Sequence, residues 1–187
     1  ATGVHPGRSR VIANTEYRPE ISVTGTFATE GMDAIRRGDM LTGGHYLGAE
    51  TLAEILQDNG ISTVIAGTKP VVLLHDRSNK KNSQAEKDSI VLFEGKTIPR
   101  TVGETLPKVN DDKNWPSNAV PNTSQDNWTT RSLLRALWKK NIPKYSLLWL
   151  SDPDKSQHDV GVGAPNALAG IESSDKNLGE VIKAVTN

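Results

Sequence analysis

The chain has 187 residues, with 22 Lys and Arg against 22 Asp and Glu, so its formal net charge is zero. This balance argues against the basic surface by which proteins usually bind nucleic acids and other polyanions. The absence of cysteine excludes disulfides and thiolate metal ligands. No stretch approaches the length and apolar content of a membrane span. The length is enough for one domain with a sizeable core and equally fits part of a larger domain.

The first half of the chain shows one clear helix-to-strand step. Residues 21–44 contain paired glycines and predict irregular structure or short strands. Residues 49–59 have apolar side chains at helical spacing and predict an amphipathic helix that Asn59 and Gly60 close. The β-branched residues 61–66 then predict a buried strand, and residues 71–74 form a second apolar run.

A large polar interruption follows over residues 76–121. Residues 76–88 are charged and predict an exposed loop or a solvated helix, in which Lys80 and Lys81 lie on a solvent-exposed face. Residues 89–93 predict a strand, residues 99–109 a short helix and residues 110–121 a surface connection.

The last third predicts two helices around a strand. Residues 122–141 carry an apolar stripe that includes Trp128 and Trp138, with Lys139 and Lys140 in the last turn. Residues 145–150 have the apolar density of a strand buried on both faces, and residues 173–185 predict a helix that packs back on the sheet. The chain is therefore predicted to be an α/β protein with a mostly parallel sheet and helices on both faces.

Polar side chains follow the strand at 145–150. Ligands of open α/β sheets bind beyond the carboxyl ends of the strands, which is where Asp152, Asp154 and His158 fall. Asp154 and His158 offer a carboxylate oxygen and an imidazole nitrogen, a pair that suits zinc and similar divalent ions. Asp152 is a candidate for a carboxylate that holds a metal-bound histidine in place. The alternative is a turn in which Asp152 or Asp154 caps the next segment and His158 is an ordinary loop histidine.

Three segments carry a resemblance to a known family. Residues 153–161, PDKSQHDVG, resemble the P-D-x-x-G-H-x-x-G element of type I phosphodiesterases and nucleotide pyrophosphatases, with Gln157 in place of the usual glycine. Residues 2–14 resemble the family's T-G-x-x-P segment that ends in an asparagine, here Asn14, although Ser9 and Arg10 replace the usual His-Gly. Residues 48–70 resemble the helix, glycine cap and parallel strand of this family, which belongs to the alkaline phosphatase superfamily.

The resemblance implies an alkaline-phosphatase-like sandwich and phosphoryl transfer with two Zn²⁺ ions per complete site. Asp154 and His158 would bind one ion, and the amide of Asn14 would donate to a phosphate oxygen. The family's nucleophile would precede Ala1, and its Asp-His ligand pair would follow Asn187. No catalytic residue is therefore assigned, and residues 1–187 are expected to form part of a domain with a polar insertion near 76–121.

The expected function is hydrolysis of phosphate mono- or diesters, with a small phosphate ester or a nucleotide as substrate. The alternatives are a phosphonate hydrolase or phosphomutase of the same superfamily, or a non-catalytic binding protein that retains the scaffold. The resemblance favours a secreted or periplasmic protein, and the sequence leaves the oligomeric state open.

Overall fold

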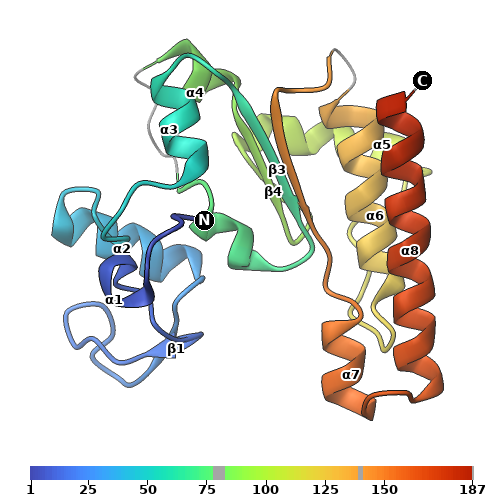
Figure 1. Ribbon diagram of the computed structural model, residues 1–187, viewed down its shortest axis with the longest axis horizontal. Helices are drawn as coiled ribbons and strands as arrows, with labels where there is room; N and C mark the ends of the chain where they lie inside the picture. The colour runs from blue at the N-terminus through green and yellow to red at the C-terminus, as the bar shows by residue number, and fades with distance from the viewer. Residues whose placement is uncertain (78–82, 139–140, 187) are drawn as a thin grey trace. The chain divides into compact units, whose positions relative to one another are not determined.

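A computed structural model describes residues 1–77, 83–138 and 141–186, and these form two compact units (Figure 1). The first unit spans residues 1–63 and 70–89, and the second spans residues 64–69 and 90–187, within the described ranges. Two predictions concern residues outside the described ranges. These are the solvent-exposed face with Lys80 and Lys81, and the last helical turn with Lys139 and Lys140.

The first unit is built from short helices and one two-stranded ribbon. Its elements are α1 (Pro6–Ser9), β1 (Thr15–Glu16), β2 (Phe27–Ala28), α2 (Met32–Thr42), α3 (Leu52–Asp58), the 3₁₀ helix η1 (Pro70–Leu74) and α4 (Gln84–Asp88). Helix α3 confirms the helix predicted at 49–59, and its start is fixed by a reciprocal capping box. Thr51 Oγ1 accepts from the Glu54 amide at 3.1 Å, and Glu54 Oε2 accepts from the Thr51 amide at 2.9 Å.

A buried arginine ties α2 to α3. The Arg77 guanidinium contacts Asp39 Oδ1 and Glu54 Oε1, each at 2.6 Å, and the side chains of Arg77 and Glu54 are 6% and 3% exposed. Asp76 beside it is fully buried and accepts from Gln57 at 2.7 Å. The prediction of an exposed segment from residue 76 is therefore wrong at its start, because these charged side chains are buried with hydrogen-bonding partners.

The second unit holds a mixed, mostly parallel sheet in the order β5-β4-β3-β6. Its elements are β3 (Thr63–Gly67), β4 (Ile90–Phe93), β5 (Lys96–Ile98), the 3₁₀ helix η2 (Arg100–Thr105), α5 (Leu106–Val109), α6 (Thr123–Ser132), the π-helical turn η3 (Leu133–Leu137), β6 (Tyr145–Trp149), α7 (Asp154–Val160) and α8 (Pro165–Thr186). Strands β3 and β4 confirm the strands predicted at 61–66 and 89–93. Both lie inside the sheet, and β4 falls within the range in which we predicted a polar insertion.

The core lies on one face of this sheet. Val64, Ala66 and Leu92 alternate toward that face and pack against side chains of α5, α6 and η3, among them the buried Trp128. Residues of the opposite face, such as Ile65 and Val91, are also buried, as the continuous apolar runs of β3 and β4 predict. The α/β prediction is therefore confirmed.

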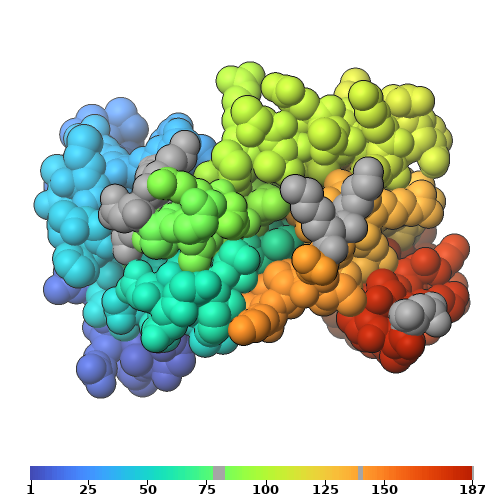
Figure 2. Space-filling model, turned by 90° about the horizontal axis from the view of Figure 1, so that it is seen from above, coloured from blue at the N-terminus to red at the C-terminus, as the bar shows by residue number. Residues whose placement is uncertain are grey.

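Strand β6 is less buried than we predicted. Its first four residues are half-buried and Trp149 is 39% exposed, because β6 lies at the edge of the sheet rather than inside it. Its orange residues reach the surface in Figure 2. The backbone amide of Thr68 donates to the Trp149 carbonyl at 2.9 Å, which aligns the carboxyl ends of β3 and β6.

The C-terminal helix α8 lies beside α6 and contacts α7 (Figure 1). It begins at Pro165, well before the segment predicted to be helical at 173–185, and continues through that segment. Small residues such as Ala167 and Gly170 are buried, whereas the side chains of Leu178, Ile182 and Val185 are 50–55% exposed. The prediction that these large residues pack back on the sheet is wrong, because the helix turns its small residues toward its neighbours.

No helix within the described ranges combines the length and apolar composition needed to cross a membrane.

Candidate functional site

The structure brings Asp154 and His158 together on one face of α7. Helix α7 starts at Asp154, and residues four apart in a helix lie one turn above each other. His158 Nε2 lies 3.3 Å from Asp154 Oδ1, and the two side chains are 80% and 59% exposed. The pair therefore places a carboxylate oxygen beside an imidazole nitrogen, two kinds of atom that zinc takes as ligands.

Lys69 is a third member of this group that the sequence analysis did not assign. It follows β3, and its ammonium contacts Asp154 Oδ2. The hydrogen bond from Lys69, followed by the charges of Lys69 and His158, lowers the pKa of Asp154 below its ordinary value. The signal was present in the sequence, because Lys69 follows the strand predicted at 61–66 just as Asp154 follows the strand predicted at 145–150.

Asp152 holds the backbone at the start of α7. Its carboxylate is buried and accepts from the Asn122 amide at 2.6 Å, the Ser156 amide at 3.1 Å and Ser156 Oγ at 2.7 Å. These bonds match the capping role that we kept as an alternative for Asp152. Our other interpretation, a carboxylate bonded to His158, is not what these contacts show, because both carboxylate oxygens serve other donors.

Asn14 belongs to the first unit, whereas Asp154 and His158 belong to the second. Its carbonyl accepts from the Thr29 amide at 2.9 Å and from Thr29 Oγ1 at 3.2 Å. The residue itself is exposed just before β1. The backbone of Asn14 is thus fixed while its side chain faces solvent, and its role toward phosphate stays a prediction.

The donor set around Asp154 suits a metal ion in kind but supplies two ligands. Across residues 1–77, 83–138 and 141–186, no three His, Asp or Glu side chains lie close enough together to hold a metal ion. Carboxylate oxygen and imidazole nitrogen are nevertheless ligands that zinc takes in catalytic sites. Asp154 and His158 are therefore of the right residue types to supply two ligands of a zinc ion, and their assignment as ligands stays a prediction.

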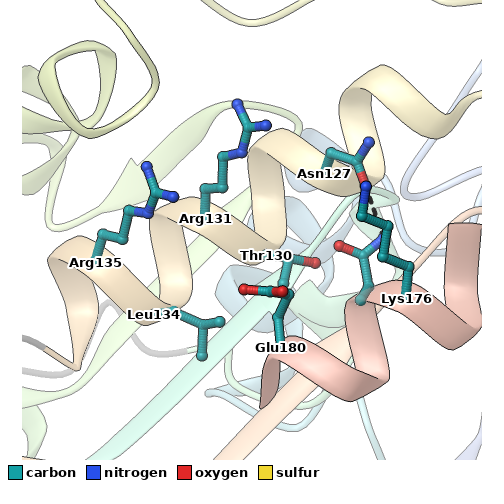
Figure 3. Close-up of a pocket in the computed structure, with 8 residues that line it drawn as sticks. Asn127, Thr130, Arg131, Leu134, Arg135, Lys176 and Glu180 are labelled. Carbon is teal, nitrogen blue, oxygen red and sulfur yellow. Dashed lines mark hydrogen bonds between the residues drawn. The ribbon is translucent and has the colours of Figure 1, made fainter. Parts of the chain in front are cut away.

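A separate hollow of about 210 Å³ lies between α6 and α8 (Figure 3). Arg131 and Arg135 project side by side from one wall, and Lys176 and Glu180 come from the other. Arg131 also pairs with Asp111 at 3.3 Å. This hollow contains neither predicted ligand, and Glu180 places a carboxylate among its cations, so we do not assign the site to it.

Comparison with protein families gives one match. The model of the type I phosphodiesterase / nucleotide pyrophosphatase family matches residues 1–187. The chain belongs to this family. Comparisons with curated proteins and with solved structures gave no match.

Membership of the type I phosphodiesterase / nucleotide pyrophosphatase family agrees with the observed architecture. The mixed sheet with helices around it is consistent with an alkaline-phosphatase-like fold. The family supports, in general terms, a hydrolase of the phosphodiesterase and nucleotide pyrophosphatase type. The segment with Asp154 and His158, on which the resemblance was based, is also the segment that places a carboxylate beside an imidazole.

Proposed function

We propose that the chain carries part of the site of a metal-dependent hydrolase of phosphate mono- or diesters, with Asp154 and His158 as ligands of a zinc ion. The observation that supports this most directly is the 3.3 Å approach of His158 Nε2 to Asp154 Oδ1 on exposed turns of one helix. Two donors of the right kind, four residues apart on a helix, form a chelating pair.

The role of each residue follows from its chemistry. His158 would offer Nε2, and Asp154 a carboxylate oxygen, to the same cation. Asp154 stays ionised at neutral pH, since its pKa lies below the ordinary value. A bound zinc ion would supply a Lewis acid that polarises phosphoryl oxygens. The amide of Asn14 would donate to a non-bridging phosphate oxygen, where charge must be held during transfer.

Zinc binding tests the ligand assignment. Isothermal titration with Zn²⁺ at pH 7.5 should show weak binding by the wild-type chain and its loss in Asp154→Ala and in His158→Ala. Asp159→Ala is the matched control, because it removes a carboxylate of the same helix that pairs with Lys155 instead. Unchanged affinity in His158→Ala would refute the assignment.

Hydrolysis is measured on the protein encoded by the complete reading frame. With a chromogenic phosphodiester and added zinc, we expect turnover that Asp154→Ala and His158→Ala both abolish and that Asp159→Ala keeps. Turnover that is independent of added metal and unaffected by both ligand variants would contradict the proposal.

A second candidate function is a non-catalytic binding protein that retains the scaffold. The contact between the Lys69 ammonium and Asp154 favours it, because a cationic side chain already neutralises the predicted ligand. Failure of the wild-type chain to bind zinc while Lys69→Gln binds it would favour this second function.

A further inference from the structure

We infer that Asp126 is a positioning residue that fixes the backbone leading into α7 and thereby the first turn of this helix, which carries Asp154. The expected effect on metal binding rests on the proposed function, because it requires that Asp154 and His158 are metal ligands. The claim that Asp126 fixes the backbone rests on hydrogen bonds alone, and these can be tested without any metal.

Asp126 is buried in the first turn of α6, where its side chain is reached from a segment distant in the sequence. The residue is 1% exposed. Its Oδ1 accepts from the Ser151 amide at 2.8 Å and from Ser151 Oγ at 3.0 Å, and its Oδ2 accepts from the Asp152 amide at 3.0 Å. Two successive backbone amides, one residue beyond the end of β6, are thus bound by one carboxylate.

Asp152 continues this arrangement into α7. The Asp152 carboxylate accepts from the Asn122 amide and from both the amide and hydroxyl of Ser156. Its own carbonyl accepts from Ser174 Oγ of α8 at 2.9 Å. The first turn of α7, which begins with Asp154, is therefore held on both sides of that residue by the same buried network.

The donors to Asp126 are neutral amide and hydroxyl groups. A buried carboxylate needs each of its acceptor positions satisfied, and a fully satisfied network fixes the groups around it. These hydrogen bonds therefore hold the start of α7 in place through neutral donors rather than through an ion pair. Residues that orient metal ligands in this way typically change metal affinity by about 10- to 100-fold when altered.

Asp126→Asn is the informative variant. It keeps the shape of the side chain but turns one oxygen into an NH₂ group that faces an amide donor of Ser151 or Asp152. Ser132→Ala is the control, because it removes one buried hydrogen bond, from Asn110 at 2.8 Å, at the other end of α6. Ser151→Ala is a second variant that removes a hydroxyl donor to Asp126 and the acceptor of Asn122 Nδ2, and leaves both amide donors to Asp126 in place.

Two measurements decide the inference, hydrogen exchange of the amides of residues 151–158 and Zn²⁺ titration by calorimetry. We expect Asp126→Asn to speed exchange in this segment and to weaken zinc binding about tenfold. Ser132→Ala should change neither beyond the effect of its lower melting temperature. If Asp126→Asn does not fold, Ser151→Ala should show the same changes at smaller size.

Unchanged exchange and affinity in a folded Asp126→Asn would overturn the inference, as would equal losses in Ser132→Ala at equal stability. A wild-type chain that binds no zinc would remove the metal assignment of the proposed function. The exchange rates would still decide, in that case, whether Asp126 fixes the segment.

Discussion

Removing the charge of Lys69 should tighten zinc binding. Its ammonium contacts Asp154 Oδ2, so an ion bound by the same carboxylate would lie near a positive charge. Two unit charges about 4 Å apart in water interact by roughly 1 kcal/mol, and a divalent ion doubles this. Screening by salt reduces the figure, which leaves about 1 to 2 kcal/mol, or roughly 5- to 30-fold in affinity, for Lys69→Gln.

The assay is calorimetric titration of Zn²⁺ into wild type, Lys69→Gln and Lys155→Gln at pH 7.5. Lys155→Gln removes the same charge from α7, but its ammonium pairs with Asp159. The advantage of Lys69→Gln should shrink between 0.1 M and 1 M salt, because the screening length falls from about 10 Å to about 3 Å. Since the Lys69 pair is exposed, stability should change by less than about 1 kcal/mol. Equal or weaker zinc binding by Lys69→Gln would refute this reasoning.

Three further predictions concern the first unit, with urea unfolding as the measurement. Arg77→Met leaves two carboxylates without their buried cation and should cost about 3 to 5 kcal/mol; a loss below 1 kcal/mol would contradict the buried network. Gly38→Ala places a methyl group 2.1 Å from the Tyr46 ring and should cost about 1 to 3 kcal/mol, whereas Gly179→Ala, with open space around it, should be neutral or stabilising. Burial lowers the pKa of His75 from 6.5 to about 4, so the unfolded chain takes up a proton first and stability should fall as pH drops from about 6.5 to 4. His75→Gln should flatten that decline, and an unchanged pH profile would speak against it.

The sequence predicted the elements in which local pattern and tertiary packing agree. Strands β3 and β4 are short apolar runs buried on both faces, and α3 has its capping box in the sequence itself. The approach of Asp154 to His158 was also predictable, because a spacing of four residues brings side chains together whenever the segment is helical.

Other features depend on contacts that no local pattern contains. Helix α2 was missed because Gly38 breaks its apolar spacing, and only the packing of Tyr46 explains a glycine there. The hairpin from β4 to β5 was missed because its turn is formed by Glu94 and Gly95. Both have positive φ, as a type I′ turn requires, but glutamate is not a residue from which this conformation is expected. The hydrogen bonds that Asp126 accepts span 25 and 26 residues, so no local pattern near Asp126 predicts them.

The π-helical turn η3 sets the direction in which the side chain of Trp138 projects from the helix that precedes β6. One extra residue per turn moves every later side chain by about 100° around the helix axis. Trp138 ends this turn, where its amide donates to the Leu133 carbonyl at 2.9 Å, and its indole Nε1 donates to Ser146 Oγ of β6 at 3.1 Å. Ordinary α-helical winding of the same residues would turn the indole by about that angle, away from Ser146 of the edge strand.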